Sequence, residues 1–485
     1  MDSPKDVKTP PRHQDASTPA RPAAAGRRDA LRRLAGWAGL GAGGAAAVAV
    51  GCAGVPSSTS SSAGSGPRAP QAPPPDPARY RIPGEFEPHR AMWIGYDAGH
   101  ADFTAALAVM LQPRTRLKVL VRDEAALSEA RALFTARRVP MAGMEFHTEA
   151  SAMYFVRDAA VLATGAERSM AVVDFAWNAY GRPGWCEAVH TRDAAARAAC
   201  IGDSAATRND LDRWFARHLG AAVFDSALYM EGGGIESNGQ GLLIASEPLL
   251  RQRHPRAEMA MLLQQHLALP GVRKVLMLPE ALAEDPPLRS TIVDRYVAWG
   301  TGGHTDEFVR FADARTVLLA WPDDADATAH PVARLNRQRM QRNWEVLSRA
   351  TDAQGRPLKV LKVPMPRIIE RRVFLSAASD PGWSKEWSAA WFPPQERKRE
   401  GDWVMQVASA SYLNFIIANG MVIAPGYTAH GTSRAVEDRV RRVLEAAFPE
   451  REVRFIDAIG LNWVGGGPHC ATLHEPDPAV GPPPG

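Results

Sequence analysis

The chain has 485 residues, of which 45% are hydrophobic and 23% are charged, and this balance is ordinary for a soluble globular protein. It excludes a polytopic membrane protein, a fibrous protein and a wholly disordered chain. Eight basic and four acidic residues fall within residues 1–51, which therefore carry the whole net charge of +4. Because the rest of the chain is neutral, it lacks the basic face that nucleic-acid binding usually requires, and we expect no nucleic-acid partner.

Residues 1–51 have the pattern of an export signal. The pair Arg27 and Arg28 precedes a charge-free run of small and apolar residues at 34–50, which resembles a twin-arginine signal. The run is short and weakly hydrophobic for a membrane span but suits a signal peptide. It ends in Val-Gly-Cys at Cys52, which resembles a lipobox. We predict lipidation of Cys52 and a periplasmic or cell-envelope, membrane-anchored lipoprotein; an uncleaved anchor helix or a soluble form cut nearby is the alternative.

Two further segments lack the apolar residues that a core needs. Residues 52–79 consist mainly of Ser, Pro, Gly and Ala, which indicates a flexible linker between the membrane and the folded body. Residues 476–485 are rich in Pro and Gly and are predicted to form a disordered tail. The folded body is therefore expected at residues 80–475.

Within the body, predicted strands alternate with predicted helices. The β-rich runs at 117–122, 316–321 and 421–424 are typical of buried strands. A helical pattern at 254–269 has Pro255 in its first turn and is stopped by a Pro-Gly pair. This alternation predicts an α/β architecture, although periodicity alone does not give its topology.

Three glycine-rich turns each place a polar side chain beside the glycines. Glu231 stands directly before three glycines, His304 directly after two, and Cys470 shortly after three. Glycine permits positive φ angles and close approach of the backbone to a small ligand. The repetition of this pattern beside Glu, His and Cys predicts a ligand site built from these turns.

Six motifs follow one another in order along the body. They are Glu85-Phe-Glu87-Pro-His89 with Trp93 after it, Val-Arg157-Asp158, Met-Glu231-Gly-Gly-Gly-Ile-Glu236, Gly-His304-Thr-Asp306-Glu307-Phe, Ser-Tyr-Leu-Asn414 and Gly-Gly-Gly-Pro468-His469-Cys470. The series resembles the agmatine deiminase and bacterial peptidylarginine deiminase family of guanidino-group-modifying enzymes over most of residues 80–476. This resemblance implies a single catalytic domain with the pentein fold, in which five ββαβ-type units surround a pseudo-fivefold axis and the active site lies at the centre. The periodicity of the sequence does not itself reveal five repeats.

The residue types suit the chemistry that the resemblance implies. A guanidinium carbon is a poor electrophile, so a soft thiolate is the suitable nucleophile, and Cys470 would form a covalent amidino-thioether while ammonia leaves. Asp158 and Asp306 would each accept N–H bonds from the planar cation. His304 would give a proton to the leaving ammonia and then activate the water that hydrolyses the intermediate.

The resemblance also assigns residues around this core. The predicted substrate-binding residues are Asp158, Asp306, Glu231, Asn414 and Trp93, with Glu231 near His304 and Asn414 near the nucleophile. Structural alternatives remain for each motif. A free cysteine is usually a small buried hydrophobe, the His304 turn is compatible with a helix cap or salt bridge, and Asp158 is compatible with a surface pair to Arg157.

No cofactor and no metal ion is expected. On ligand type alone, His304, Asp306, His469 and Cys470 form a conceivable zinc set. Their spacing along the chain is not that of a compact zinc motif, so the covalent roles are preferred.

The sequence departs from the family pattern in several places. Pro468 directly precedes His469, where one residue is missing, and two alanines follow Asp158 in place of a glycine-containing turn. Residues 178–210 and 378–404 resemble insertions, and we expect both to cover or reshape the mouth of the pocket. The second is rich in aromatic residues: Trp383, Trp387, Trp391, Phe392 and Trp403.

The first insertion holds two of the four cysteines, Cys186 and Cys200. An exported protein meets oxidants, and a bond between cysteines 14 residues apart would close a loop that stabilises the fold by about 3 kcal/mol. We therefore predict a disulfide between them.

Several functions fit these observations. The leading hypothesis is hydrolysis of agmatine to N-carbamoylputrescine and ammonia, because a Trp-rich insertion can close a pocket over a small cation. The alternative is deimination of peptidylarginine, with an arginyl peptide as the partner, and a non-catalytic guanidino-binding lipoprotein or an amidinotransferase is less favoured. A closed pocket with an acid facing the amine favours agmatine, whereas an open groove favours peptide. The oligomeric state is not predicted.

Overall fold

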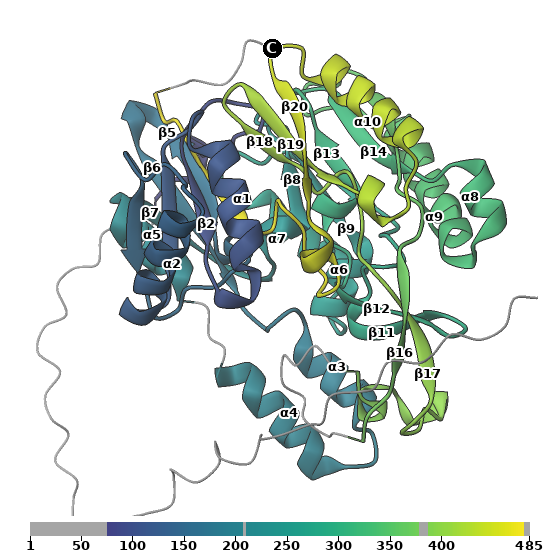
Figure 1. The fold of residues 1–485 in the computed structure, drawn as a ribbon. Coiled ribbons are helices and arrows are strands. Elements are labelled where there is room, and N and C mark those ends of the chain that lie inside the picture. The colour runs from purple at the N-terminus through teal and green to yellow at the C-terminus, as the bar shows by residue number, and fades with distance from the viewer. Residues whose placement is uncertain (1–74, 207–209, 378–386, 480–485) are drawn as a thin grey trace, which may run out of the picture. The chain divides into compact units, whose positions relative to one another are not determined.

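The structure is a computed structural model that describes residues 75–206, 210–377 and 387–479 (Figure 1). Cys52 and the rest of the predicted signal lie outside the described residues, as does Trp383. Within the described ranges, no helix is both long enough and apolar enough to span a bilayer.

Five units of one topology make up most of the described chain. In each unit two antiparallel strands are followed by a helical crossover and a third strand parallel to the second. Four units are continuous: β5 (Val161–Gly165), β6 (Met170–Ala176) and β7 (Ala222–Tyr229); β8 (Ile235–Ser237), β9 (Leu242–Ser246) and β10 (Lys274–Leu278); β13 (Val309–Phe311), β14 (Thr316–Trp321) and β15 (Lys359–Pro364); β18 (Ile416–Ala418), β19 (Met421–Gly426) and β20 (Glu452–Asp457).

The fifth unit joins the two ends of the folded body. The last strand, β21 (Thr472–Pro476), pairs antiparallel with β2 (His89–Gly95), and β2 lies parallel to β3 (Leu117–Val121). Two short strands extend the sheets at their edges: β1 (Tyr80–Arg81) beside β5 and β4 (Glu145–Thr148) beside β3. The nucleophile candidate Cys470 therefore directly precedes the first strand of this fifth unit.

The crossovers hold most of the helices. They are α1 (Ala101–Leu111) between β2 and β3, α3 (Arg182–Val189), α4 (Ala194–Ala206) and α5 (Leu211–Leu219) between β6 and β7, α6 (Glu247–Arg253) and α7 (Met259–Leu267) between β9 and β10, α8 (Asp324–Ala329) and α9 (Pro331–Leu347) between β14 and β15, and α10 (Arg434–Ala447) between β19 and β20. Two helices lie outside the crossovers: α2 (Glu124–Ala136) joins β3 to β4, and α11 (Ile459–Asn462) follows β20. The α/β architecture and the predicted strands are confirmed. The helix predicted at 254–269 begins later, at Met259, because a turn closed by the bond from Ala257 N to His254 O precedes it.

The central strands are buried along their length because helices cover one face and a neighbouring unit the other. All five residues of β3 and of β9 are buried. Continuous burial explains why these strands appear as unbroken apolar runs rather than as an alternating pattern.

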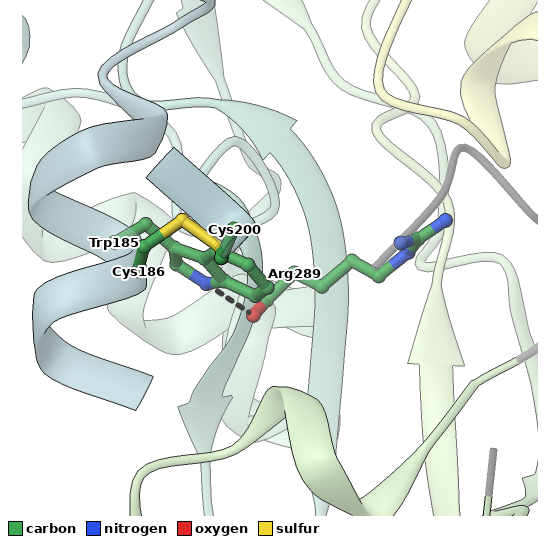
Figure 2. Close-up of a disulfide and its surroundings, with 4 residues drawn as sticks. All are labelled: Trp185, Cys186, Cys200 and Arg289. Atoms are coloured by element: carbon green, nitrogen blue, oxygen red, sulfur yellow. Dashed lines mark hydrogen bonds between the residues drawn. A yellow bond between two sulfur atoms is a disulfide. The ribbon is translucent and has the colours of Figure 1, made fainter. Parts of the chain in front are cut away.

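A further sheet lies outside the five units and brings the two insertions together. Its order is β11 (Pro287–Val293), β12 (Tyr296–Thr301), β17 (Trp403–Val407) and β16 (Glu370–Phe374). The predicted disulfide between Cys186 and Cys200 is present, with 5.9 Å between the Cα atoms, and joins α3 to α4 (Figure 2). Trp387, Trp391 and Phe392 of the second insertion pack with Trp185 in the same apolar cluster.

Candidate active site

Five equivalent loops carry the predicted site residues, apart from Trp93. Each loop directly precedes the first strand of a unit, so the shared topology of the units brings the five loops together. They hold Asp158 before β5, Glu231 before β8, His304 and Asp306 before β13, Asn414 before β18 and Cys470 before β21.

Hydrogen bonds join these five loops in a closed ring. The bonds run from Arg157 N to Cys470 O (3.1 Å), Gly233 N to Asp158 Oδ1 (3.2 Å), Thr305 Oγ1 to Gly233 O (3.0 Å), Asn414 Nδ2 to Glu307 Oε1 (2.9 Å) and His469 N to Asn414 Oδ1 (2.9 Å). Every loop is thereby bonded to both of its neighbours. The ring fixes the relative positions of side chains that lie up to about three hundred residues apart in the sequence.

Gly233 shows why a glycine turn is needed in this ring. A Cβ atom at this position would lie 2.6 Å from His304 Nδ1 and 2.9 Å from Asp306 Oδ2, closer than van der Waals contact allows. The absence of a side chain therefore lets the polar groups converge.

Cys470 lies at the centre of the cluster and is 2% exposed. Its Sγ accepts a hydrogen bond from Asn414 Nδ2 at 3.3 Å and lies 3.6 Å from Asp306 Oδ2. Burial raises the pKa of the thiol well above its ordinary value, and the carboxylates of Asp306 and Asp158 raise it further. Without a cation in the site, Cys470 is therefore a thiol, and a bound guanidinium would favour the thiolate.

His304 is a buried imidazolium held between carboxylates. Its Nε2 lies 3.3 Å from Glu231 Oε2, and Glu231 is itself paired with Arg253, which donates from Nε at 3.0 Å. Burial lowers the pKa of His304, but Asp158, Glu231 and Asp306 outweigh this effect and raise it to about 9. At neutral pH His304 carries a proton that it can give to a leaving amine.

The carboxylates of Asp158 and Asp306 differ in their hydrogen-bond partners. Asp158 accepts from the Tyr180 hydroxyl at 2.9 Å and from Gly233 N, whereas Asp306 Oδ2 lies 2.7 Å from His469 Nδ1. The other oxygen of Asp306 is buried and has no hydrogen-bond partner among the described residues. Buried polar atoms normally have a partner, so this oxygen is available to a ligand that donates N–H groups.

Comparison with known proteins identifies the family. A model of the Porphyromonas-type peptidyl-arginine deiminases matches residues 81–476. The chain belongs to this family. Agmatine deiminases are among its relatives: that of Pseudomonas fluorescens is 31% identical over 254 residues, which are 51% of this chain and 57% of the relative. That of Medicago truncatula is 26% identical over 417 residues, 82% of this chain and 96% of the relative.

The chain thus spans little more than half the length of the Pseudomonas relative that it matches. Solved structures of agmatine deiminases match more of it. The Enterococcus faecalis structure has a TM-score of 0.59 at 21% identity, and the C. jejuni structure 0.53 at 13%; each covers 82% of this chain and is itself covered to 96%. These likenesses, together with the five units, confirm the pentein fold.

In this family member a cavity of about 40 Å³ lies beside Cys470. Cys470 and Asp158 lie in its wall, and the remaining lining is mainly apolar and aromatic: Phe155, Tyr180, Leu288, Trp299, Gly300, Thr301, Val464, Gly465 and Gly466. Phe155 and Trp299 were not among the predicted site residues. Phe155 lies next to the Arg157-Asp158 motif, which is a signal for it, whereas Trp299 lies in β12, outside every motif.

The prediction that Trp93 binds substrate does not fit its position. Trp93 is fully buried in the core, 5.0 Å from the ring of Phe215, and its Nε1 donates to Glu475 Oε2 at 2.9 Å. It does not line the cavity. Its side chain packs instead with residues of the β2 and α5 region, because β2 is a central strand whose residues are almost all buried.

The insertion tryptophans also have another role than the one predicted. Trp387 and Trp391 are buried but do not line the cavity. The Arg289 guanidinium lies between the rings of Trp299 and Trp391, 3.7 and 3.8 Å from their centres. The second insertion therefore contacts the cavity wall indirectly, through Arg289, which packs against Trp299. Trp403, at the end of this insertion, is 38% exposed.

One group of side chains within the described residues has atoms close enough to hold a metal ion. Asp306, Glu307 and Cys470 have ligand atoms within 4.8 Å of one another. The four-residue zinc set considered from the sequence is not assembled, since His304 and His469 do not belong to this group. Burial raises the pKa of Glu307 well above its ordinary value, and a neutral acid is a poor ligand.

Glu85, in the first motif, contacts the candidate site through His469. Glu85 is paired with Arg157 and Arg310, both at 2.5 Å, and lies 2.8 Å from His469 Nε2. The other nitrogen of His469 contacts Asp306. Glu85 thus orients Asp306 through a histidine.

We expect Glu85→Gln to lower kcat/KM about 10- to 100-fold, because it weakens a charge-assisted bond that is typically worth about 1.5–3 kcal/mol. Glu87→Gln is the matched control, since Glu87 is a buried glutamate that pairs with Arg81 at 2.6 Å and makes no contact with the five site loops. Steady-state kinetics and thermal unfolding of both variants test this. Equal losses of kcat/KM in the two would contradict the positioning role.

Proposed function

We propose that this protein hydrolyses a guanidino group, with Cys470 as the nucleophile. The observation that carries the proposal is the convergence of Cys470, a protonated His304 and two aspartates in one buried cluster. One carboxylate oxygen of that cluster has no partner among the described residues. The charge and shape of a guanidinium satisfy both aspartates at once.

The reaction has two covalent steps. When the cation binds, the Cys470 thiol loses its proton to solvent, and the thiolate attacks the guanidinium carbon. A C–S bond forms, one C–N bond breaks, and His304 gives its proton to the nitrogen that leaves as ammonia. Water then attacks the amidino-thioether carbon; neutral His304 accepts one water proton, the second passes to the departing ammonia as ammonium, and the C–S bond breaks to release the ureido product and the thiolate. Glu231 keeps His304 oriented for both transfers.

We propose a small cation, agmatine, as the substrate, with N-carbamoylputrescine and ammonia as products. The small volume of the cavity and the 2% exposure of Cys470 support a short, thin substrate rather than a peptide. The described lining contains no carboxylate other than Asp158, so the acid expected to face the far amine is not found there. The aromatic ring of Phe155 in the cavity wall is suited to bind that ammonium instead, since Trp299 already contacts the Arg289 guanidinium.

Ammonia release from agmatine, free arginine and an internal arginine of a peptide, measured in parallel with the full-length protein, tests this proposal. We expect agmatine to give the highest kcat/KM. A faster reaction with the peptide would favour peptidylarginine deimination, the activity in the name of the family model. Binding of these compounds without ammonia release would indicate a guanidino-binding protein.

The reaction should also lose activity in acid. Burial and the nearby carboxylates raise the pKa of Asp158 to about 6, against the opposing effect of His304. Below this pH Asp158 is neutral and no longer balances the guanidinium charge, so kcat/KM should fall as the pH decreases through about 6. A pH profile of kcat/KM that stays flat between pH 7 and 5 would contradict this role of Asp158.

We further propose that the protein is exported and held at the cell envelope by lipid on Cys52. The arginine pair, the apolar run and the small residues before Cys52 support this. A single acyl chain binds a membrane only marginally, so stable anchoring requires more than one. Mass spectrometry of the mature N-terminus is expected to show a lipid-modified cysteine, and an unmodified N-terminal residue would contradict it.

A further inference from the structure

Tyr180, in the insertion at 178–210, reaches the candidate site. Its hydroxyl donates to Asp158 Oδ2 at 2.9 Å, and its side chain lines the cavity that also contains Cys470. The residue is 8% exposed, and burial with the nearby Asp158 raises its pKa well above 10, so it remains a donor. The proposed reaction does not use this contact.

The backbone around Tyr180 is held in an unusual conformation. Ala179, Tyr180 and Gly181 have φ angles of 52°, 59° and 73°, a region that residues other than glycine seldom adopt. Neighbouring contacts stabilise this turn: Gln252 Nε2 and Arg253 Nη1 both donate to Tyr180 O at 3.0 Å. Such strain persists only where the surroundings determine the conformation, and it is often found at functional sites.

The turn at Tyr180 is hydrogen-bonded both to Asp158 and, through Arg253 and Glu231, to the network that holds His304. Arg253, which binds the carbonyl of Tyr180, also holds Glu231, the partner of His304. The hydroxyl of Tyr180 holds Asp158. One residue of the insertion therefore contacts the network of the proton donor and that of the guanidinium-binding carboxylate.

The disulfide fixes the segment that follows this turn. Helix α3 begins at Arg182, two residues after Tyr180, and Cys186 within it is bonded to Cys200 of α4 (Figure 2). Trp185 Nε1 donates to the backbone oxygen of Arg289 in β11 at 3.2 Å, as Figure 2 also shows. The disulfide thus joins two helices of the insertion, and the Trp185 bond holds the insertion against the sheet that contributes Leu288 and Trp299 to the cavity wall.

We propose that Tyr180 is a positioning residue for Asp158 and that the Cys186–Cys200 disulfide keeps it in place. The inference rests on the proposed function, because its consequence is a correctly oriented acceptor for the guanidinium. An insertion that is closed by an oxidised pair thereby becomes part of the active site.

Tyr180→Phe removes only the hydroxyl and tests the contact directly. We expect KM for agmatine to rise about tenfold with a smaller change in kcat. The hydrogen bond from Tyr180 lowers the pKa of Asp158, as His304 also does, whereas Asp306 and Glu231 raise it. Without the hydroxyl this pKa rises, so the acid limb of the kcat/KM profile should move to higher pH. Tyr296→Phe is the control, since Tyr296 is a partly buried tyrosine of β12 whose ring packs against His330, and it neither lines the cavity nor lies in one of the five loops; it should change neither quantity.

The disulfide provides a second arm. Reduction of the wild type, or the double substitution Cys186→Ser with Cys200→Ser, should raise KM in the same direction as Tyr180→Phe. The same treatment of Tyr180→Phe should add little, because both act through one contact. Additive effects, or no effect of Tyr180→Phe on KM and on the pH profile, would overturn the inference.

A measurement without substrate separates this inference from the proposed function. If the wild type releases no ammonia from any guanidino compound, the proposed function fails, and a double-mutant cycle in chemical denaturation still tests the contact. Tyr180→Phe and Asp158→Ala should be non-additive in unfolding free energy, whereas Tyr296→Phe and Asp158→Ala should be additive. Additivity of the first pair would overturn the positioning role by itself.

Discussion

Replacing Cys470 with serine is expected to lower ammonia release about 1000-fold or more while leaving the fold and substrate binding nearly intact. Serine is close in size to cysteine, so the buried site keeps its packing, but a hydroxyl at this position is a much weaker nucleophile than a thiolate. The measurements are kcat for ammonia release and calorimetric binding of agmatine to the variant. Activity within about tenfold of the wild type would contradict the proposed mechanism.

Covalent labelling provides an independent check on the same residue. A guanidine mimic that carries a haloacetamidine group should modify Cys470, which is the free cysteine among the described residues, since Cys186 and Cys200 are bonded to each other. Peptide mass spectrometry locates the label. Modification of Cys186 or Cys200 in place of Cys470 would contradict the assignment of the nucleophile.

Asp306→Asn is expected to lower kcat/KM by roughly 10²–10⁴-fold, through both KM and kcat. The substitution removes a buried negative charge that balances His304 and the incoming cation, and breaking such a pair typically costs about 3–5 kcal/mol. Asp158→Asn should act in the same direction, because it also leaves the guanidinium without a charge partner. Steady-state kinetics with agmatine measures both effects.

Asp352→Asn is the control for a general loss of a buried carboxylate. Asp352 is 1% exposed and pairs with Arg356 at 2.6 Å, outside the ring of loops. It should lower the melting temperature without changing KM. If Asp306→Asn and Asp352→Asn changed stability alike and left kcat/KM alike, the guanidinium-binding role of Asp306 would be wrong.

The fivefold repetition of the fold was not visible in the amino-acid sequence. First strands such as β8 and β18 have only three residues each, and the crossovers between second and third strands range from one helix to three. A repeat of such unequal length leaves no period in hydrophobicity. The pairing of β21 with β2 joins residues almost four hundred positions apart, and only the folded chain shows it.

The amino-acid sequence by itself determined the α/β class, the family resemblance and the side chains with the relevant chemistry, because these are properties of residue type and local order. The glycines beside Glu231, His304 and Cys470 correctly indicated a crowded site. The disulfide was also predictable, since two cysteines in one short insertion have few other partners.

The tertiary structure alone decided which aromatic residues line the cavity and which residues hydrogen-bond to the site residues and so fix their positions. Trp93 lies near a motif but packs in the core, whereas Trp299 lies outside every motif and faces the cavity. Tyr180 and Glu85 reach Asp158 and His469 across separations of 22 and 384 residues. Contacts of this kind depend on how the loops of separate units converge, and no local pattern of residues encodes that convergence.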